Sequence, residues 1–160
     1  MIVVAVSLLA LIAFVFVVGL MLPAQRTFVK QATLKSPVEQ VFRVVTEFRQ
    51  QADWRSDVQA IQPIDATTWT EVPKNGTPIT FTTKQKIENQ IFEIAIIAPK
   101  SFQGYWIGTF EKTTNNGTKV VFKEVVTVNN PFFRVFSFLF VDLDKSMDTY
   151  LHDLRRELGE

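Results

Sequence analysis

The residue with the greatest capacity for chemistry in this chain is a glutamate inside an apolar strand. Glu124 shares one face of an extended segment with Phe122 and Val126, while Lys119 and Lys123 lie on the other face. The lysines favour an inward Glu124; if the other face is the inner one, Glu124 is exposed. A carboxylate in an apolar cavity has a raised pKa and can serve as an acid, a base or a ligand anchor. Glu124 is therefore our candidate catalytic residue.

The sequence does not favour a catalytic or metal-binding role for its other reactive side chains. Glu93 also interrupts an apolar strand, but Phe92 and Ile94 take the inward face and place Glu93 outside. His152, the only histidine, stands beside Asp153 and away from the apolar stripe, as a solvated helix residue would. The absence of cysteine excludes disulfides, thiolate metal sites and cysteine nucleophiles. No phosphate loop, nucleophile elbow or dinucleotide fingerprint occurs, so we expect no cofactor and no metal.

Composition narrows the class of partner. Lys and Arg total 17 against 16 for Asp and Glu, and a net charge of +1 gives no reason to expect a nucleic acid partner. The chain contains 15 phenylalanines among its 160 residues. So many large aromatic side chains indicate a wide or partly hollow interior, or contact with lipid.

The segments that must position these residues begin with a strand and two short helices. Residues 26–36 alternate as a strand does, with Leu34 among the inward residues. Ser36 then suits the N-cap of a helix, Pro37 its first position and Glu39 the capping-box position. The helix carries an apolar stripe of Val38, Val41, Phe42 and Val45. A second short helix is predicted over residues 51–58.

Antiparallel strands follow as far as residue 128. We predict them over residues 66–72, 79–87, 91–98, 102–112 and 119–128. Asn75-Gly76, the region of Glu88-Asn89, and Asn116-Gly117 provide the tight turns. Both Asn-Gly-Thr triplets also match the glycosylation sequence, but turn formation accounts for them without it.

The last predicted element is one long C-terminal helix. Asn130 can cap it and Pro131 takes its first position. Apolar residues then recur at helical spacing: Phe136, Leu139, Leu143, Met147, Tyr150, Leu154 and Leu158. Residues 132–141 are apolar nearly all round, which predicts burial on several sides or contact with an apolar surface.

The N-terminal segment is long and apolar enough to cross a membrane. Residues 2–22 contain no charge. We predict a transmembrane anchor over residues 1–24 and one soluble domain over residues 25–160; cleavage of a signal peptide near Pro23 is the alternative. Arg26, Lys30, Lys35 and Arg43 follow the segment, which favours a single-pass membrane protein with its domain in the cytoplasm. The same charges could instead serve the solubility of the domain.

The order of the elements resembles that of the helix-grip fold. Residues 36–42 after the first strand, Ala52-Asp53-Trp54-Arg55 and the helix from Pro131 are similar to the START-like (SRPBCC) superfamily of polyketide cyclases/dehydrases and lipid-transfer domains. The resemblance covers residues 26–158. It implies an α+β fold in which a curved antiparallel sheet wraps around a long C-terminal helix over a hydrophobic cavity. This superfamily has no universal catalytic motif, so activity must be argued from the site.

The resemblance places Trp54 near the cavity mouth, although a large aromatic residue there could equally plug the gap between helix and sheet. With the strand faces and the C-terminal helix, it gives the expected ligand-binding residues: Trp54, Phe81, Phe92, Ile94, Phe122, Glu124, Val126, Phe136, Leu139 and Leu143. A solid core would need the same apolar residues.

Three functions are consistent with this sequence. We favour a membrane-anchored domain that binds a lipid or another hydrophobic small molecule between the sheet and the C-terminal helix. A cyclase/dehydrase-type enzyme using Glu124 is less favoured, because the sequence identifies no second polar group facing that carboxylate. A solidly packed interaction domain is the third. The expected partners are the small molecule and, through residues 2–22, the membrane; the sequence identifies no protein partner.

Overall fold

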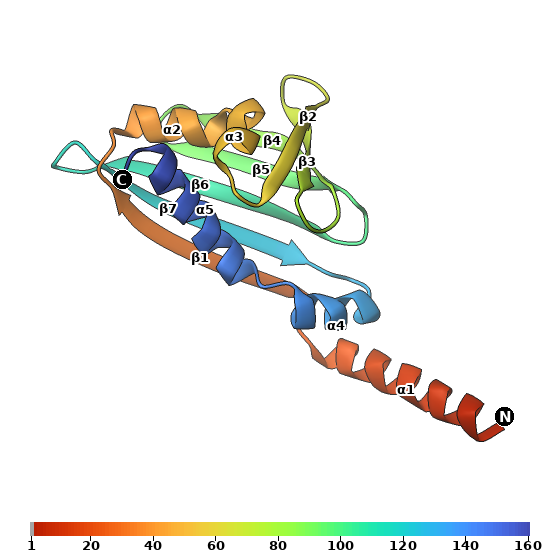
Figure 1. Cartoon of the computed structure of the whole chain (residues 1–160). Coiled ribbons are helices and arrows are strands. Elements are labelled where there is room, and N and C mark those ends of the chain that lie inside the picture. Colours follow the sequence, from red (N-terminus) through yellow and green to blue (C-terminus); the bar gives the residue numbers. More distant parts are fainter. Residues whose placement is uncertain (1) are drawn as a thin grey trace.

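A curved antiparallel sheet forms the body of the molecule (Figure 1). The computed structural model describes residues 2–160. The spatial order of the seven strands is β1-β7-β6-β5-β4-β3-β2, so the first and last strands of the chain are neighbours. The strands are β1 Gln25–Leu34, β2 Val58–Pro63, β3 Thr68–Pro73, β4 Ile79–Ile87, β5 Ile91–Ala98, β6 Gln103–Lys112 and β7 Thr118–Thr127.

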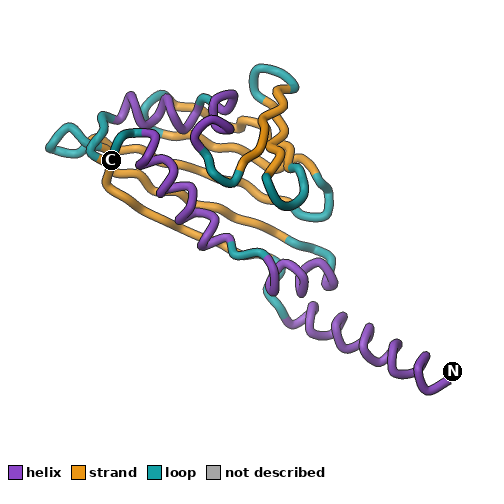
Figure 2. Tube along the Cα trace, viewed as in Figure 1, coloured by secondary structure: helices purple, strands orange, loops and turns teal. Residues whose placement is uncertain are grey.

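Helices cover one face of this sheet (Figures 1 and 2). Between β1 and β2 lie α2 Val38–Thr46, the 3-10 turn η1 Phe48–Gln50 and α3 Gln51–Trp54, and the chain closes with α5 Leu143–Glu157. The core lies between these two layers. Trp69 and Leu154 are fully buried there, and the predicted stripe of Val38, Val41, Phe42 and Val45 is buried as well. The α+β helix-grip fold predicted from the sequence is thus confirmed.

Two apolar helices lie outside this arrangement. α1 Ile2–Met21 projects from the domain, and α4 Pro131–Phe140 packs beside the end of α1 that joins the domain (Figure 1). α1 is apolar throughout, and most of its side chains are exposed rather than packed against the domain. The helix is therefore long and apolar enough to cross a membrane, a property that an N-terminal signal sequence shares.

The strands from residue 79 onward match the prediction to within a residue or two, and the predicted turns join them. Asn89 and Asn116 both have positive φ, which asparagine tolerates in turns. The prediction is wrong around β2, because the expected helix over residues 51–58 ends at Trp54. Val58 instead begins β2 and lies opposite Pro73 of β3. Pairing with β3 therefore decides the structure of this segment.

The first domain helix begins one residue later than predicted. Pro37 occupies the N-cap position, without a side-chain cap, and Ser36 lies before it. The amide and the hydroxyl of Ser36 each donate to Glu160 at 2.9 Å. Because this long-range contact uses the hydroxyl, Ser36 does not cap the helix as expected.

The C-terminal helix is broken, contrary to the prediction of one long helix. Asn130 and Pro131 start α4 as expected: the Asn130 side chain accepts from the amide of Phe132 at 2.9 Å. The helix ends at Phe140, and Asp142 then caps α5 by accepting from the Lys145 amide at 3.0 Å. This second cap restarts the helix and separates the two parts of the predicted apolar stripe.

Candidate ligand-binding site

A cavity of about 450 Å³ lies between the sheet and α5. Its apolar wall comes from β4, β5, β6, β7 and the start of α5, and includes Phe81, Phe92, Ile94, Trp106, Phe122 and Leu143. Inward positions of neighbouring strands form this wall: Ile94 is opposite Trp106, and Trp106 is opposite Glu124. The concave face of the sheet is thus left partly unfilled.

The cavity has a mouth at one end of α5. Exposed lining residues mark it: Asn75, Gly76 and Thr77 on the β3–β4 turn, with Val141 and Ser146 opposite. Val141 belongs to the short link between α4 and α5. Movement of either the turn or this link would therefore alter access to the cavity.

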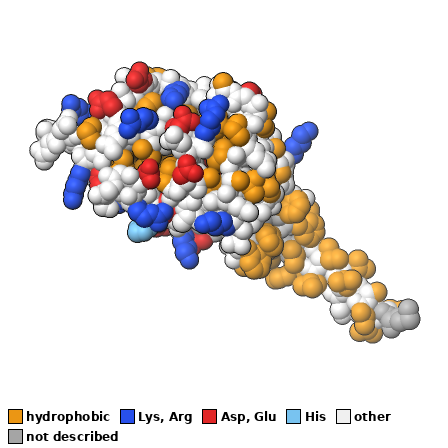
Figure 3. Space-filling model, turned by 45° about the horizontal axis from the view of Figure 1, so that its top comes forward, with side chains coloured by type: hydrophobic (Ala, Val, Ile, Leu, Met, Phe, Trp, Pro, Cys, Tyr) orange, Lys and Arg blue, Asp and Glu red, His pale blue; other side chains and the backbone are white. Residues whose placement is uncertain are grey.

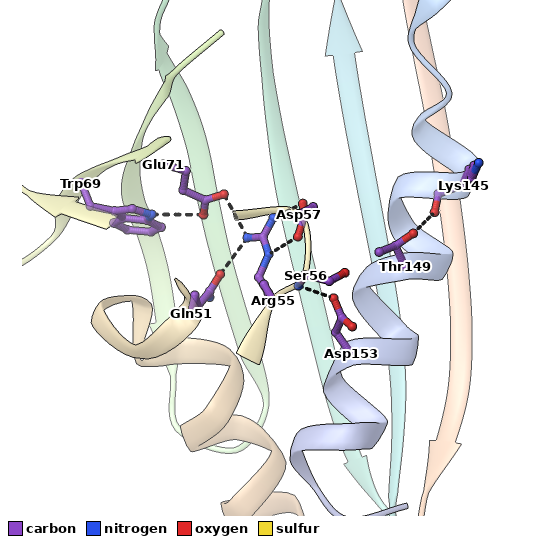
Figure 4. Close-up of polar contacts among 9 residues, drawn as sticks. All are labelled: Gln51, Arg55, Ser56, Asp57, Trp69, Glu71, Lys145, Thr149 and Asp153. Carbon is purple, nitrogen blue, oxygen red and sulfur yellow. Dashed lines mark hydrogen bonds and ion pairs between the residues drawn. The ribbon is translucent and has the colours of Figure 1, made fainter. Parts of the chain in front are cut away.

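A polar cluster centred on Arg55 lines the same cavity (Figure 4). The guanidinium lies 2.9 Å from a carboxylate oxygen of Glu71 and 2.8 Å from one of Asp57, and it donates to the Gln51 side chain at 2.9 Å. The indole of Trp69 donates to the second oxygen of Glu71 at 3.2 Å. These contacts hold the end of α3 against β3 and fix the direction of the Arg55 side chain.

Electrostatics within the cluster keep Arg55 charged. Burial by itself would lower the pKa of Arg55, but the charges of Glu71 and Asp57 outweigh it and raise the pKa above its ordinary value. The guanidinium lies over the ring of Tyr150 of α5, with 5.3 Å between the ring centre and the guanidinium carbon. Burial raises the pKa of Tyr150, so its phenol stays protonated and able to donate a hydrogen bond.

Glu124 faces the cavity as the sequence predicted. It lies on β7 between Phe28 of β1 and Trp106 of β6. Burial raises the pKa of Glu124 to about 7; the charge of Arg55 lowers the pKa, and that of Glu71 raises it further. The carboxyl group therefore changes protonation state near neutral pH, in a cavity that also holds a phenol and a guanidinium.

The structure brings six of the ten predicted ligand-binding residues to the cavity wall: Phe81, Phe92, Ile94, Phe122, Glu124 and Leu143. Trp54 and Val126 are buried outside the cavity lining. Trp54 packs edge-on against Tyr150 at 5.3 Å and so fills space behind the cavity, which is the plug alternative. Phe136 and Leu139 are 59% and 70% exposed on α4, because the helix break turns them away from the sheet.

Sequence reasoning missed much of the polar cluster. Arg55 directly follows Trp54, and Tyr150 belongs to the predicted stripe, but the sequence pattern marks neither as a site residue. Glu71 lies on β3, and only the fold brings it to Arg55. A charged residue directly after an aromatic one in a short helix was the available signal. Within residues 2–160, no group of three or more His, Asp or Glu residues could hold a metal ion.

Comparison with solved structures supports the assignment of the fold. A START superfamily protein from Mycobacterium smegmatis aligns with a TM-score of 0.66 at 10% identity, covering 83% of this chain and 97% of that one. An aromatase/cyclase, Zhui, from a Streptomyces species gives 0.69 at 11% identity over 83% and 93%. Norcoclaurine synthase from a Thalictrum species gives 0.67 at 6% identity over 82% and 92%. At such identities the likeness concerns the fold alone.

One protein family matches most of the sequence. No curated protein matches the chain. The profile of one family, described as polyketide cyclase / dehydrase and lipid transport, matches residues 25–159, which is nearly the whole predicted soluble domain. Together with the cavity, this match supports a ligand-binding domain. The chain therefore belongs to the polyketide cyclase / dehydrase and lipid transport family.

Proposed function

We propose that this protein binds a hydrophobic small molecule, such as a lipid, in the cavity beneath α5 while α1 tethers it to a membrane. The observation that carries the proposal is the cavity itself, which combines apolar walls with one partly buried polar cluster. Its volume of about 450 Å³ is within the range of about 300–1,000 Å³ that is typical of small-molecule sites. The ligand expected is an amphiphile with a largely apolar body.

The polar cluster indicates how such a ligand would be oriented. Arg55 carries a positive charge that Glu71 and Asp57 balance, Tyr150 provides a protonated phenol, and Glu124 provides a carboxyl group that can donate or accept depending on pH. A ligand with a carbonyl or hydroxyl group at one end would place that group here, because a buried polar group needs a hydrogen-bond partner. The apolar part would extend along Phe81, Phe92 and Ile94, which line the same cavity.

Tethering would increase uptake of a membrane-soluble ligand, because it confines the domain to the surface where the ligand is concentrated. We place the domain on the cytoplasmic side, since basic residues follow α1. One of these charges also has a structural role: Lys30 lies 2.9 Å from carboxylate oxygens of both Asp144 and Asp148. In sealed vesicles that keep the cytoplasmic side inward, the domain should be protected from added protease.

A second candidate function is proton-transfer catalysis of the cyclase or dehydrase type. The specific observation in its favour is that Glu124, with a pKa of about 7, lines one cavity with Tyr150 and Arg55. Such a carboxyl group can act as a general base or acid near neutral pH, while the protonated phenol can donate a hydrogen bond to an oxyanion. Replacing Glu124 with Gln separates the two functions, because it abolishes turnover but leaves binding of a neutral ligand nearly intact.

The experiment that tests binding is native mass spectrometry of the full chain released from lipid nanodiscs, with organic extraction to identify the passenger. Ile94→Trp fills the cavity and should remove the passenger. Ile97→Trp provides the matched control, because Ile97 is 49% exposed on the same strand and should leave the passenger in place. An empty wild-type protein that also takes up no lipid from a panel would contradict the proposal and favour the solidly packed domain.

A further inference from the structure

α4 exposes an apolar surface that the domain leaves uncovered. Phe133, Phe136, Leu139 and Phe140 are 53%, 59%, 70% and 69% exposed, and Phe132 and Val141 at its two ends are each 40% exposed. These residues belong to a single helix and its final link. A continuous apolar surface of this kind marks an interaction site on a folded protein.

The only charged residue of α4 is withdrawn from this surface. Arg134 is 9% exposed, and its guanidinium donates to the carbonyls of Gly19 at 2.9 Å and Leu22 at 3.0 Å, at the C-terminal end of α1. It also donates to the carbonyls of Val128 and Asn129, each at 3.1 Å. A cation here satisfies helix-terminal carbonyls that would otherwise lack donors. The exposed part of α4 thus carries no charge.

The same contacts join α4 closely to α1. A Cβ atom on Gly19 would clash with the carbonyl oxygen of Pro131, so only glycine permits this approach. Phe16 packs against Phe132 with ring centres 5.6 Å apart. In the space-filling view, hydrophobic side chains run along α1 and continue onto the adjoining end of the domain (Figure 3). The apolar surfaces of the two helices are therefore continuous.

We infer that α4 is a membrane-surface helix, which inserts its apolar face into the bilayer that α1 crosses. This inference rests on the membrane tether of the proposed function. A bilayer is the occupant that the structure favours, because α4 is attached to the domain end of the proposed span, where the boundary between hydrocarbon and headgroups lies. Arg26 fits this boundary: its guanidinium lies 4.5 Å from the ring centre of Phe138, with an apolar stem and a charged end.

This placement identifies the source of the ligand. Val141 ends the apolar surface of α4 and also lines the cavity mouth. With α4 in the interface, the mouth opens at the lipid surface, and an amphiphile passes from the bilayer to the cavity without crossing water. The substrate class is thus a bilayer-resident amphiphile rather than a metabolite collected from solution.

The natural absence of cysteine allows a direct test with the full chain in nanodiscs. Leu139→Cys and His152→Cys variants carry one nitroxide each, the second at an exposed residue of α5. We expect the ratio of collision with oxygen to collision with a water-soluble nickel reagent to be several-fold higher at Leu139. Equal ratios at both sites would overturn the inference. Protection of Leu139 from both reagents, with dipolar broadening between chains, would show instead that a second copy covers α4.

A second pair of variants tests the junction. Gly19→Val should separate α4 from α1 and shift the Leu139 label towards water, whereas Leu20→Val, at a 57% exposed position of the same helix, should not. If the Leu139 label had the same ratio of oxygen to nickel collisions in both variants, the role of the junction would be overturned. Ligand content is measured separately by mass spectrometry: a filled cavity with a water-exposed Leu139 label refutes only the docking of α4. An empty cavity with a lipid-exposed label refutes only ligand binding.

Discussion

Replacing Glu124 with glutamine should remove a pH-dependent loss of stability from the folded protein. The substitution preserves the shape of the side chain and removes its titratable proton. Burial raises the pKa of Glu124 from 4.5 to about 7 in the folded protein. In the unfolded chain the carboxyl group is solvated and returns to its ordinary pKa. The two states of the protein therefore bind different numbers of protons between these two pH values.

The sign of the effect follows from which state holds the proton. Between about pH 4.5 and 7 the folded protein keeps Glu124 protonated while the unfolded chain has lost the proton, so the free energy of unfolding falls as pH rises. The full loss is reached above the folded-state pKa. Each tenfold change in an acid constant equals about 1.4 kcal/mol, which gives roughly 3 kcal/mol for this carboxyl group, as an order of magnitude.

Urea unfolding of the full chain in a neutral detergent, followed by tryptophan fluorescence, measures this difference. Wild-type protein should lose more stability between pH 5 and pH 9 than Glu124→Gln does, by a few kcal/mol. Glu88→Gln, which removes an exposed carboxylate from the β4–β5 turn, should behave as wild type. If wild type and Glu124→Gln lost equal stability over this interval, the raised pKa of Glu124 in the folded protein would be refuted.

Two further predictions test the polar cluster and the helix break. Arg55→Met should raise the pKa of Glu124 because it removes a positive charge, and Glu71→Gln should lower that pKa because it removes a negative one. Infrared titration of the Glu124 carboxyl band measures both shifts. Shifts of the same sign would contradict the assignment. Leu154→Ala should cost about 2–5 kcal/mol in the same urea assay, since Leu154 is fully buried. Leu139→Ala should cost about 0.5 kcal/mol or less, and equal losses would show that α4 faces a core.

The strands were predictable because their signals are local. Asn116-Gly117 defines a turn whatever the rest of the chain does, and the alternation around Glu124 identifies the inward face of β7. The same alternation identifies Phe92 and Ile94 of β5 and Phe122 of β7 as inward residues, and all three line the cavity. By contrast, β2 was missed, because residues 51–58 have no strong period of their own and pairing with β3 determines the conformation of Val58.

The polar cluster could not be predicted by the same means. Arg55 and Glu71 are 16 residues apart, and their contact requires both the bend after α3 and the pairing of β2 with β3. A hydrophobic pattern says nothing of which charges will meet inside a fold. Burying an ion pair is costly unless its geometry is good, and apolar residues of similar size often give equal or greater stability. The position of this cluster beside a cavity is therefore consistent with the proposed ligand binding, whereas stability alone does not require it.

The C-terminal helix is broken because the two parts of its apolar stripe pack in different directions. The stripe of α5 must face the sheet, because Met147 and Leu154 are buried in the core, and Lys30 of β1 adds exposed ion pairs with Asp144 and Asp148. The stripe of α4 must remain next to α1, where Arg134 binds the last carbonyls of that helix. One straight helix would direct both parts of the stripe toward the same side. Asp142 separates them by starting a new helix, and the mouth of the cavity lies at the joint that this separation creates.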